Sequence, residues 1–281
     1  MNRREFLKAA VLAGAAIALP ACGRSQGGTA QVFLGAGELI SGSTARLPFG
    51  LLDGHGMPLQ GRRASVWVGE DVEGQKGRAG LSGPYEAPYR VFQHAREGEP
   101  EGFYAATVTI PDARIARVHV ETDDGAGSTV FQPKKAASVL RVGDAAPAIR
   151  TPTVRAPGGV ANLCTLEPMC GLHEVSLHEA LRKGTTVVLS IASPKLCTSR
   201  MCGPVLEEVL QVRRNDPDVQ YIHLEPYATD NTAKLSSAAE AWRIESEPWT
   251  FVISAHGKVA ASFEGPVLAS EITDALRTAS A

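Results

Sequence analysis

The sequence predicts two folded units, an all-β sandwich domain over residues 31–135 followed by an α/β domain over residues 142–281. Two observations predict this arrangement. Short apolar segments separated by turn residues fill the first range, whereas strand-like and helix-like segments alternate in the second. The net charge of −2 and the absence of a basic run argue against nucleic-acid binding.

Residues 1–22 have the features of an export signal. Arg3 and Arg4 precede an apolar stretch that is too short to remain in a membrane as a spanning helix. The segment resembles a twin-arginine signal, and the LPAC sequence ending at Cys22 resembles a bacterial lipoprotein cleavage box. This resemblance implies lipidation of Cys22 and a location on the outer side of the cytoplasmic membrane or in the periplasm. Plain cleavage is the alternative, and residues 23–30 are expected to form a tether.

Seven strands are expected in the β domain, and this number resembles an immunoglobulin-like sandwich. Residues 70–87, rich in glycine, are expected to form a long loop or lid. The scattered histidines His55, His94 and His119 predict no metal site, and docking of a partner is the alternative role of this domain. The expected strands are 31–34, 45–52, 64–68, 88–93, 103–110, 115–121 and 128–131.

The α/β domain is expected to be built around one central strand. Residues 185–192 are a continuous β-branched and apolar run, which predicts a strand covered on both faces. The remaining strands are expected at 219–224, 249–253 and 259–263, and helices at 177–183, after Pro204, at 233–242 and from Ser270.

Two cysteines follow the central strand and predict thiol chemistry. Cys202 precedes a helix opened by Gly203 and Pro204, because proline suits a first helical position. Unpaired N–H groups and the helix dipole favour a thiolate there. Cys197 lies five residues upstream, so the chain between the two sulfurs must fold back if they are to bond. We expect Cys202 to be the attacking sulfur and Cys197 the resolving one.

The order of strand, short loop, Cys-Gly-Pro and helix resembles the redox loop of the thioredoxin superfamily. The usual motif there is Cys-Gly-Pro-Cys, whereas Val205 replaces the second cysteine here, and the C-x4-C spacing is similar to a branch of bacterial thioredoxin-like proteins. The resemblance covers about half the chain and implies a thioredoxin-like C-terminal domain. It also implies that Pro248 is cis and that Glu247 and Pro248 present the backbone of a substrate.

The remaining cysteines, Cys164 and Cys170, lie in a turn-rich stretch. Four cysteines allow three pairings, which the sequence alone does not distinguish. Local pairing favours a structural disulfide between Cys164 and Cys170, and a relay that exchanges electrons with the other pair is the alternative.

The expected function is an exported, membrane-tethered thiol–disulfide oxidoreductase that needs no cofactor and no metal. Its partners would be protein or small thiols and disulfides, or a membrane-bound redox protein. Two alternatives remain. One is a redox-inactive binding lipoprotein with structural disulfides. The other is a copper-delivering chaperone, for which His223 and His256 are the available histidines.

Overall fold

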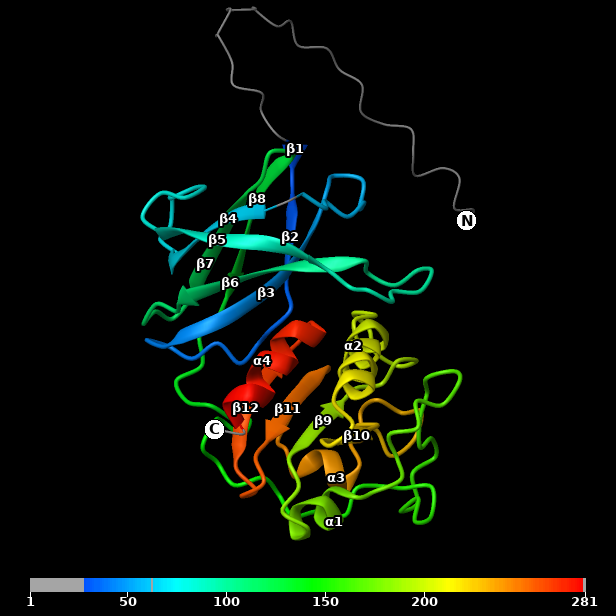
Figure 1. Cartoon of the computed structure of the whole chain (residues 1–281). Helices are drawn as coiled ribbons and strands as arrows, with labels where there is room; N and C mark the ends of the chain where they lie inside the picture. Colours follow the sequence, from blue (N-terminus) through cyan, green and yellow to red (C-terminus); the bar gives the residue numbers. More distant parts are fainter. Residues whose placement is uncertain (1–27, 62, 280–281) are drawn as a thin grey trace, which may run out of the picture.

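The structure is a computed structural model that describes residues 28–61 and 63–279, and it is predominantly β (Figure 1). Arg3, Arg4, Cys22 and most of the expected tether lie outside the described residues. Within the described part of the chain, no helix has the length and apolar character needed to cross a membrane. The first eight strands are β1 (Gly28–Thr29), β2 (Gln31–Leu34), β3 (Thr44–Leu52), β4 (Arg63–Glu70), β5 (Ser82–Val91), β6 (Gly102–Thr109), β7 (Ala116–Glu121) and β8 (Gly125–Phe131).

These eight strands form one continuous sheet in the order β1-β8-β7-β4-β5-β6-β3-β2, so the predicted immunoglobulin-like sandwich class is wrong. The physical reason lies in β5. Its first part pairs with β4, and its last three residues, Tyr89 to Val91, pair with β6. One long strand thereby joins two sets of strands that a sandwich would keep in separate sheets. The edge strand β2 also lies against β8, which brings the sheet close to a barrel.

Two local predictions in this part of the chain are also wrong. Residues 82–87, expected in a loop, belong to β5, whose side chains are mostly exposed and therefore show no apolar run. Gly28 and Thr29, expected in the tether, form β1 and pair in parallel with Gly125 and Ala126 of β8. In both segments, backbone pairing outweighs a weak side-chain pattern.

The second part of the chain contains a four-stranded sheet in the order β10-β9-β11-β12. Strands β9 and β10 are parallel, whereas β11 is antiparallel to both β9 and β12. The elements are α1 (Leu177–Arg182), β9 (Val187–Ile191), α2 (Cys202–Asn215), β10 (Gln220–Leu224), α3 (Ser237–Glu240), β11 (Trp249–Ile253), β12 (Val259–Glu264) and α4 (Ala269–Ala279).

The predicted α/β thioredoxin-like class is likewise wrong, because the described part of the chain is mostly β and shows no distinct α/β domain. Helices α1 and α3 have only 6 and 4 residues, and residues 132–176 form neither helix nor strand. Prolines and glycines recur through 147–171 and interrupt regular hydrogen bonding there. The helix expected at 233–242 is confined to α3, because Ser236 caps its start and Arg243 turns to a φ of 56° just after it.

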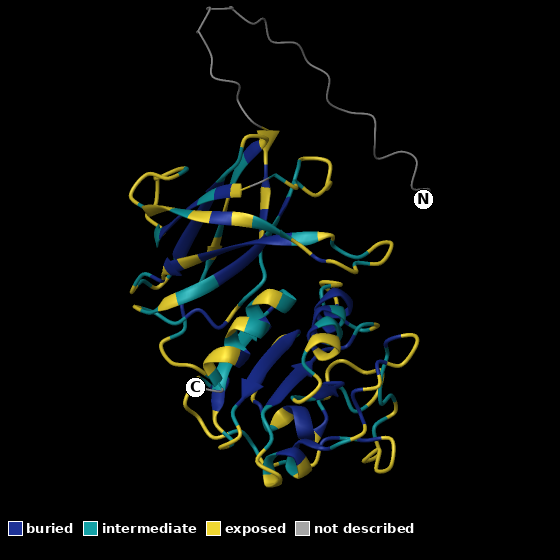
Figure 2. Cartoon of the chain, viewed as in Figure 1, coloured by how far each residue is buried: buried dark blue, intermediate teal, exposed yellow. Residues whose placement is uncertain are grey.

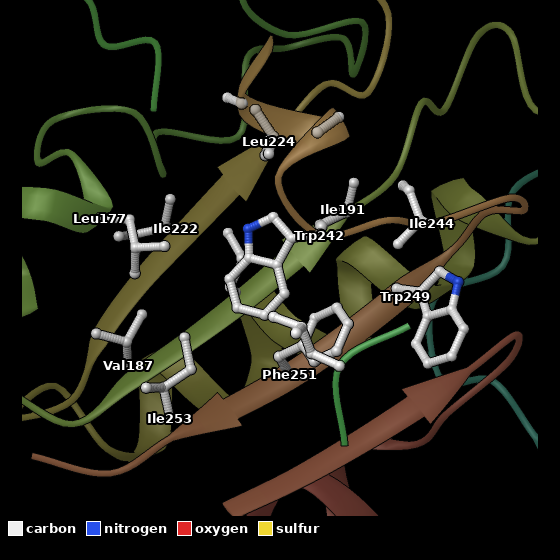
Figure 3. Packing of buried hydrophobic residues seen from close by; sticks show 14 of the residues in the cluster. Leu177, Val187, Ile191, Ile222, Leu224, Trp242, Ile244, Trp249, Phe251 and Ile253 are labelled. Carbon is white, nitrogen blue, oxygen red and sulfur yellow. The ribbon is translucent and has the colours of Figure 1, made fainter. Parts of the chain in front are cut away.

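The four-stranded sheet is covered on both faces. Helices α2 and α4 lie between it and the eight-stranded sheet, and α1 and α3 cover the opposite face (Figure 1). All five residues of β9 are buried, as the continuous apolar run predicts (Figure 2). Leu189 and Ile191 belong to the core on the α1 and α3 side, where Trp242 and Phe251 pack together (Figure 3). Val188 belongs to the core on the other side.

The two sheets share that second core through β6. Phe103 and Ala105 pack with the apolar residues of α2 and α4, whereas Tyr104 and Ala106 belong to the inner core of the eight-stranded sheet. Side chains alternate across a strand, so β6 is covered on both faces. Polar contacts reinforce this interface, since Arg46 Nε lies 2.8 Å from Glu271 Oε1 of α4.

Glu208 of α2 ties three parts of the chain together although it is only 1% exposed. One carboxylate oxygen accepts a hydrogen bond from the backbone N–H of Gln93 in the β5–β6 loop at 3.0 Å. The other accepts one from the backbone N–H of Ala269, at the start of α4, at 2.7 Å. A buried carboxylate satisfied in this way fixes α2 against both neighbours.

Candidate thiol redox site

The loop after β9 brings the two predicted cysteines together at the start of α2. The Cys197 N–H donates to the Ser193 carbonyl at 3.0 Å, and the Arg200 N–H donates to the Cys197 carbonyl at 3.1 Å. Arg200 has a φ of 57°, which turns the chain back on itself. As expected, Cys197 lies in a loop that folds over Cys202, the first residue of α2.

Antiparallel pairing carries a third group to this site. Trp249, the first residue of β11, pairs with Ile191, the last residue of β9. The Glu247–Pro248 segment that precedes β11 therefore lies beside the loop that follows β9. Ligand atoms of Glu247, Cys197 and Cys202 all lie within 4.8 Å of one another.

The Cys197 thiol is the more acidic of the pair. Its pKa is lowered to about 6, first by a hydrogen bond from the Cys202 thiol and then by the Ser199 hydroxyl, whose oxygen lies 3.2 Å away. The backbone N–H groups of Cys202 and Met201 add to the effect. A thiol with this pKa is mainly ionised at neutral pH.

The Cys202 thiol behaves in the opposite way. Burial raises its pKa well above the ordinary value, and the Cys197 sulfur and the negative charge of Glu247 raise it further. Cys202 is completely buried, whereas Cys197 keeps 6% exposure. Desolvation of Cys202 outweighs the helix N-terminus, so the order of the two thiol pKa values is opposite to the one expected from the sequence.

Glu247 is a half-buried acid next to Cys202. Burial raises its pKa to about 7, and the charge of Cys197 contributes in the same direction. The Tyr227 hydroxyl donates a hydrogen bond to Glu247 Oε1 at 2.9 Å and opposes this rise. The second oxygen, Oε2, is buried without a hydrogen-bond partner among the described residues. A carboxyl group with this pKa can exchange protons near neutral pH.

The other predicted residues of the site lie around this centre. The Glu247–Pro248 peptide bond is cis, as expected, and the Pro248 carbonyl accepts a hydrogen bond from the Gly265 N–H at 2.9 Å. Gly203 and Pro204 are buried in the first turn of α2. A side chain at Gly203 would collide with the Glu99 carboxylate, so the β5–β6 loop covers this turn of α2.

The second cysteine pair lies in a different cluster. The Cys164 and Cys170 sulfur atoms are 3.6 Å apart and unbonded, and His173 and His223 face them. His256 lies in the turn after β11, whose last residue pairs with the first residue of β9, at the end of that strand remote from the cysteines. Among the described residues, no histidine therefore joins the Cys197 and Cys202 cluster.

Sequence reasoning missed several residues of these sites. Ser199 lies between the two cysteines, and this position in the sequence is the signal that could have indicated a hydrogen bond to one of them. His173 follows Cys170 by three residues, a spacing typical of metal ligands. Tyr227 gave no local signal, because only tertiary packing brings its hydroxyl to Glu247.

No family model matches the chain, and no curated protein matches it. Among solved structures, the chain is similar to the Lin-41 filamin domain, at 11% sequence identity and a TM-score of 0.22. That likeness covers 39% of this chain and 95% of the filamin domain. A likeness this weak supports no conclusion about fold or function.

Proposed function

We propose that this protein is a thiol–disulfide oxidoreductase in which Cys197 attacks and Cys202 resolves. The observation that carries the proposal is the grouping of a low-pKa cysteine, a buried high-pKa cysteine and a half-buried carboxyl group within 4.8 Å. The proposed substrates are protein or small-molecule disulfides and thiols, with a membrane-bound redox protein as the partner that restores the pair. No cofactor takes part in this exchange.

In the first step, the Cys197 thiolate attacks one sulfur of a substrate disulfide. A bond forms between Cys197 and that sulfur, the substrate S–S bond breaks, and the other substrate sulfur leaves with the electron pair and takes a proton from water. This mixed disulfide removes the negative charge of Cys197, which had helped to raise the pKa of Glu247. Glu247 therefore ionises more readily when a base is needed.

In the second step, Glu247 takes the proton of the Cys202 thiol. The Cys202 sulfur then attacks the Cys197 sulfur, and the mixed disulfide breaks as the substrate sulfur leaves with the electron pair and takes a proton from water. The products are a Cys197–Cys202 disulfide and a second substrate thiol, so two electrons pass from the cysteine pair to the substrate. The reverse sequence would oxidise a substrate dithiol.

The roles of the cysteines predict an asymmetric trapping result. Cys202→Ser is expected to accumulate a stable mixed disulfide with a model protein disulfide, because Cys197 still attacks and nothing resolves the product. Cys197→Ser should trap nothing, because the remaining thiol is buried and protonated. Non-reducing electrophoresis and mass spectrometry measure the adduct, and Met57→Ser, at an exposed position outside both cysteine clusters, is the control that should turn over normally. Trapping by Cys197→Ser instead would reverse the roles, and trapping by neither would favour a redox-inactive binding protein.

The copper-chaperone alternative is less well supported by the geometry. The cluster offers two sulfurs and one carboxylate, whereas Cu(I) favours soft thiolate, thioether or imidazole ligands. A preference for copper over disulfide exchange in the purified protein would support that alternative.

We also propose export by the twin-arginine route and tethering to the membrane through a lipid on Cys22. Replacing Arg3 and Arg4 by Lys is expected to leave the precursor in the cytoplasm, and Cys22→Ala should release the mature protein from membranes. Cell fractionation with immunoblotting measures both results. Lys8→Arg preserves the charge next to the motif and should be exported normally. Retention of Cys22→Ala in the membrane fraction contradicts the lipid anchor.

A further inference from the structure

Four side chains of the types that bind metal ions lie close together, although one of them is distant in sequence from the other three. Cys164, Cys170 and His173 come from the irregular segment before α1, and His223 comes from β10. Their ligand atoms all lie within 4.8 Å of one another, and His173 and His223 are each 1% exposed. The group is separate from the redox cluster of Cys197, Cys202 and Glu247.

We propose that Cys164, Cys170, His173 and His223 form a tetrahedral Zn²⁺ site. The distances between neighbouring ligand atoms carry this inference. Cys164 Sγ and Cys170 Sγ are 3.6 Å apart, and both lie near His223 Nδ1, at 3.6 Å and 3.4 Å. His173 Nε2 lies 3.4 Å from Cys170 Sγ.

These distances agree with the dimensions of a single zinc ion. Zn–S bonds of about 2.3 Å and Zn–N bonds of about 2.0 Å at tetrahedral angles separate two sulfurs by about 3.8 Å and a sulfur from a nitrogen by about 3.5 Å. A set of two thiolates and two imidazoles in tetrahedral geometry is typical of zinc. Two thiolate charges also balance Zn²⁺, which allows the site to be buried without a net charge.

The second nitrogen of His223 is already oriented for this role. His223 Nε2 lies 2.8 Å from the Ala192 carbonyl oxygen, which can only accept a hydrogen bond. Nε2 therefore carries the proton, and Nδ1 presents its lone pair to the two sulfurs. Ligating histidines usually make a contact of this kind to a backbone carbonyl.

Other occupants of this cluster fit less well. A disulfide requires the two sulfurs to be about 2.05 Å apart. It would also leave the convergence of the two histidines on the sulfurs without an explanation. A [2Fe–2S] cluster places its cysteine and histidine ligands on different irons, whereas all four ligand atoms here fit around one ion.

Such an ion would anchor a long segment that lacks regular structure. Residues 132–176 contain no helix or strand, and the site would tie their cysteine stretch to β10 of the sheet. The anchored stretch also supports the redox loop, because Thr165 Oγ1 accepts a hydrogen bond from the Lys195 N–H at 3.1 Å. Zinc binding therefore contributes folding free energy at the place where the redox loop needs support.

The test uses the full chain with Cys197→Ser and Cys202→Ser, which removes the redox pair as a competing ligand. After reduction, we expect uptake of one Zn²⁺ per chain by elemental analysis and a higher urea midpoint with zinc than without it. Co²⁺ in its place should give the visible d–d bands of a tetrahedral site and thiolate-to-cobalt charge transfer. His173→Gln and His223→Gln are each expected to weaken binding at least 10-fold, whereas His178→Gln on α1 should bind normally.

A further variant keeps the test informative if a histidine variant fails to fold. Cys164→Ser should retain weaker cobalt binding with about half the charge-transfer intensity. Absence of zinc or cobalt uptake by the reduced protein would overturn the proposal. So would exclusive uptake of Cu(I), or unchanged cobalt spectra in the two histidine variants.

Discussion

Glu247→Gln is expected to slow resolution of the mixed disulfide by roughly 100-fold while leaving the attack step nearly unchanged. The Cys202 thiol has a raised pKa and loses its neighbouring base in this variant. Loss of the Glu247 charge also makes Cys202 somewhat more acidic, which limits the effect to the lower part of the range for general base catalysis. Cys197 keeps the hydrogen bonds from the Cys202 thiol and from backbone N–H groups that lower its pKa, so the attack step is preserved.

The pH dependence separates the two steps. In the native protein, attack should rise with pH through about 6, where Cys197 ionises, and then level off. Resolution requires ionised Glu247, so it should rise through a higher value, up to about 7. Glu247→Gln is expected to move only the second profile to higher pH, because Cys202 must then ionise without a base.

Single-turnover kinetics with an aromatic disulfide resolve both steps, since attack releases the first chromophoric thiol and resolution releases the second. Glu245→Gln is the matched control, because this neighbouring carboxylate is exposed and pairs with Lys134 instead. If the resolution step in Glu247→Gln keeps the rate and the pH dependence of the native protein, Glu247 is not the base.

The second large effect is expected for Phe103→Ala, which should destabilise the protein by about 3–5 kcal/mol. Phe103 is completely buried, and its ring packs against Phe92 with ring centroids 5.3 Å apart. It belongs to the same core as Val205 and Leu206 of α2. Loss of this ring should therefore loosen α2 as well as β6.

Hydrogen exchange followed by mass spectrometry tests this coupling. Exchange of peptides from both β6 and α2 should increase in Phe103→Ala, and the urea midpoint should fall. Phe33→Ala is the matched control, because that ring is 51% exposed and its loss should change stability by no more than about 0.5 kcal/mol. Faster exchange confined to the eight-stranded sheet would show that the two parts of the chain are stabilised separately.

This interface also bears on the domain boundary predicted from the sequence. A chain beginning near Leu140 is expected from composition alone to fold and to retain its thiol chemistry. In the structure it would lose Phe92 and Phe103 from the core that they share with Val205 and Leu206. We therefore expect the shortened chain to be unstable, and soluble, redox-active protein of that length would contradict this expectation.

The errors in the predicted fold have a common physical origin. The seven segments expected as strands overlap β2 to β8, but the sequence did not indicate that β5 joins both halves into one sheet. Which strands pair is decided by long-range backbone hydrogen bonds, which leave no periodic pattern in a single segment. The same limit applies to β6, whose apolar run reflects two different cores, one on each face.

The local placement of Cys197 and Cys202 was determined by the sequence itself. The apolar run of β9, the proline at the start of α2 and the spacing of Cys197 and Cys202 predict a folded loop with two cysteines, because these preferences are properties of short segments. Only the tertiary structure decided which sulfur is the thiolate, since the pKa of a thiol depends on burial and on neighbours contributed by other segments. Strand pairing placed Glu247 beside the cysteines, and β10 carried His223 to Cys164 and Cys170. These groups are distant in sequence, and packing of the whole chain is what brings them together.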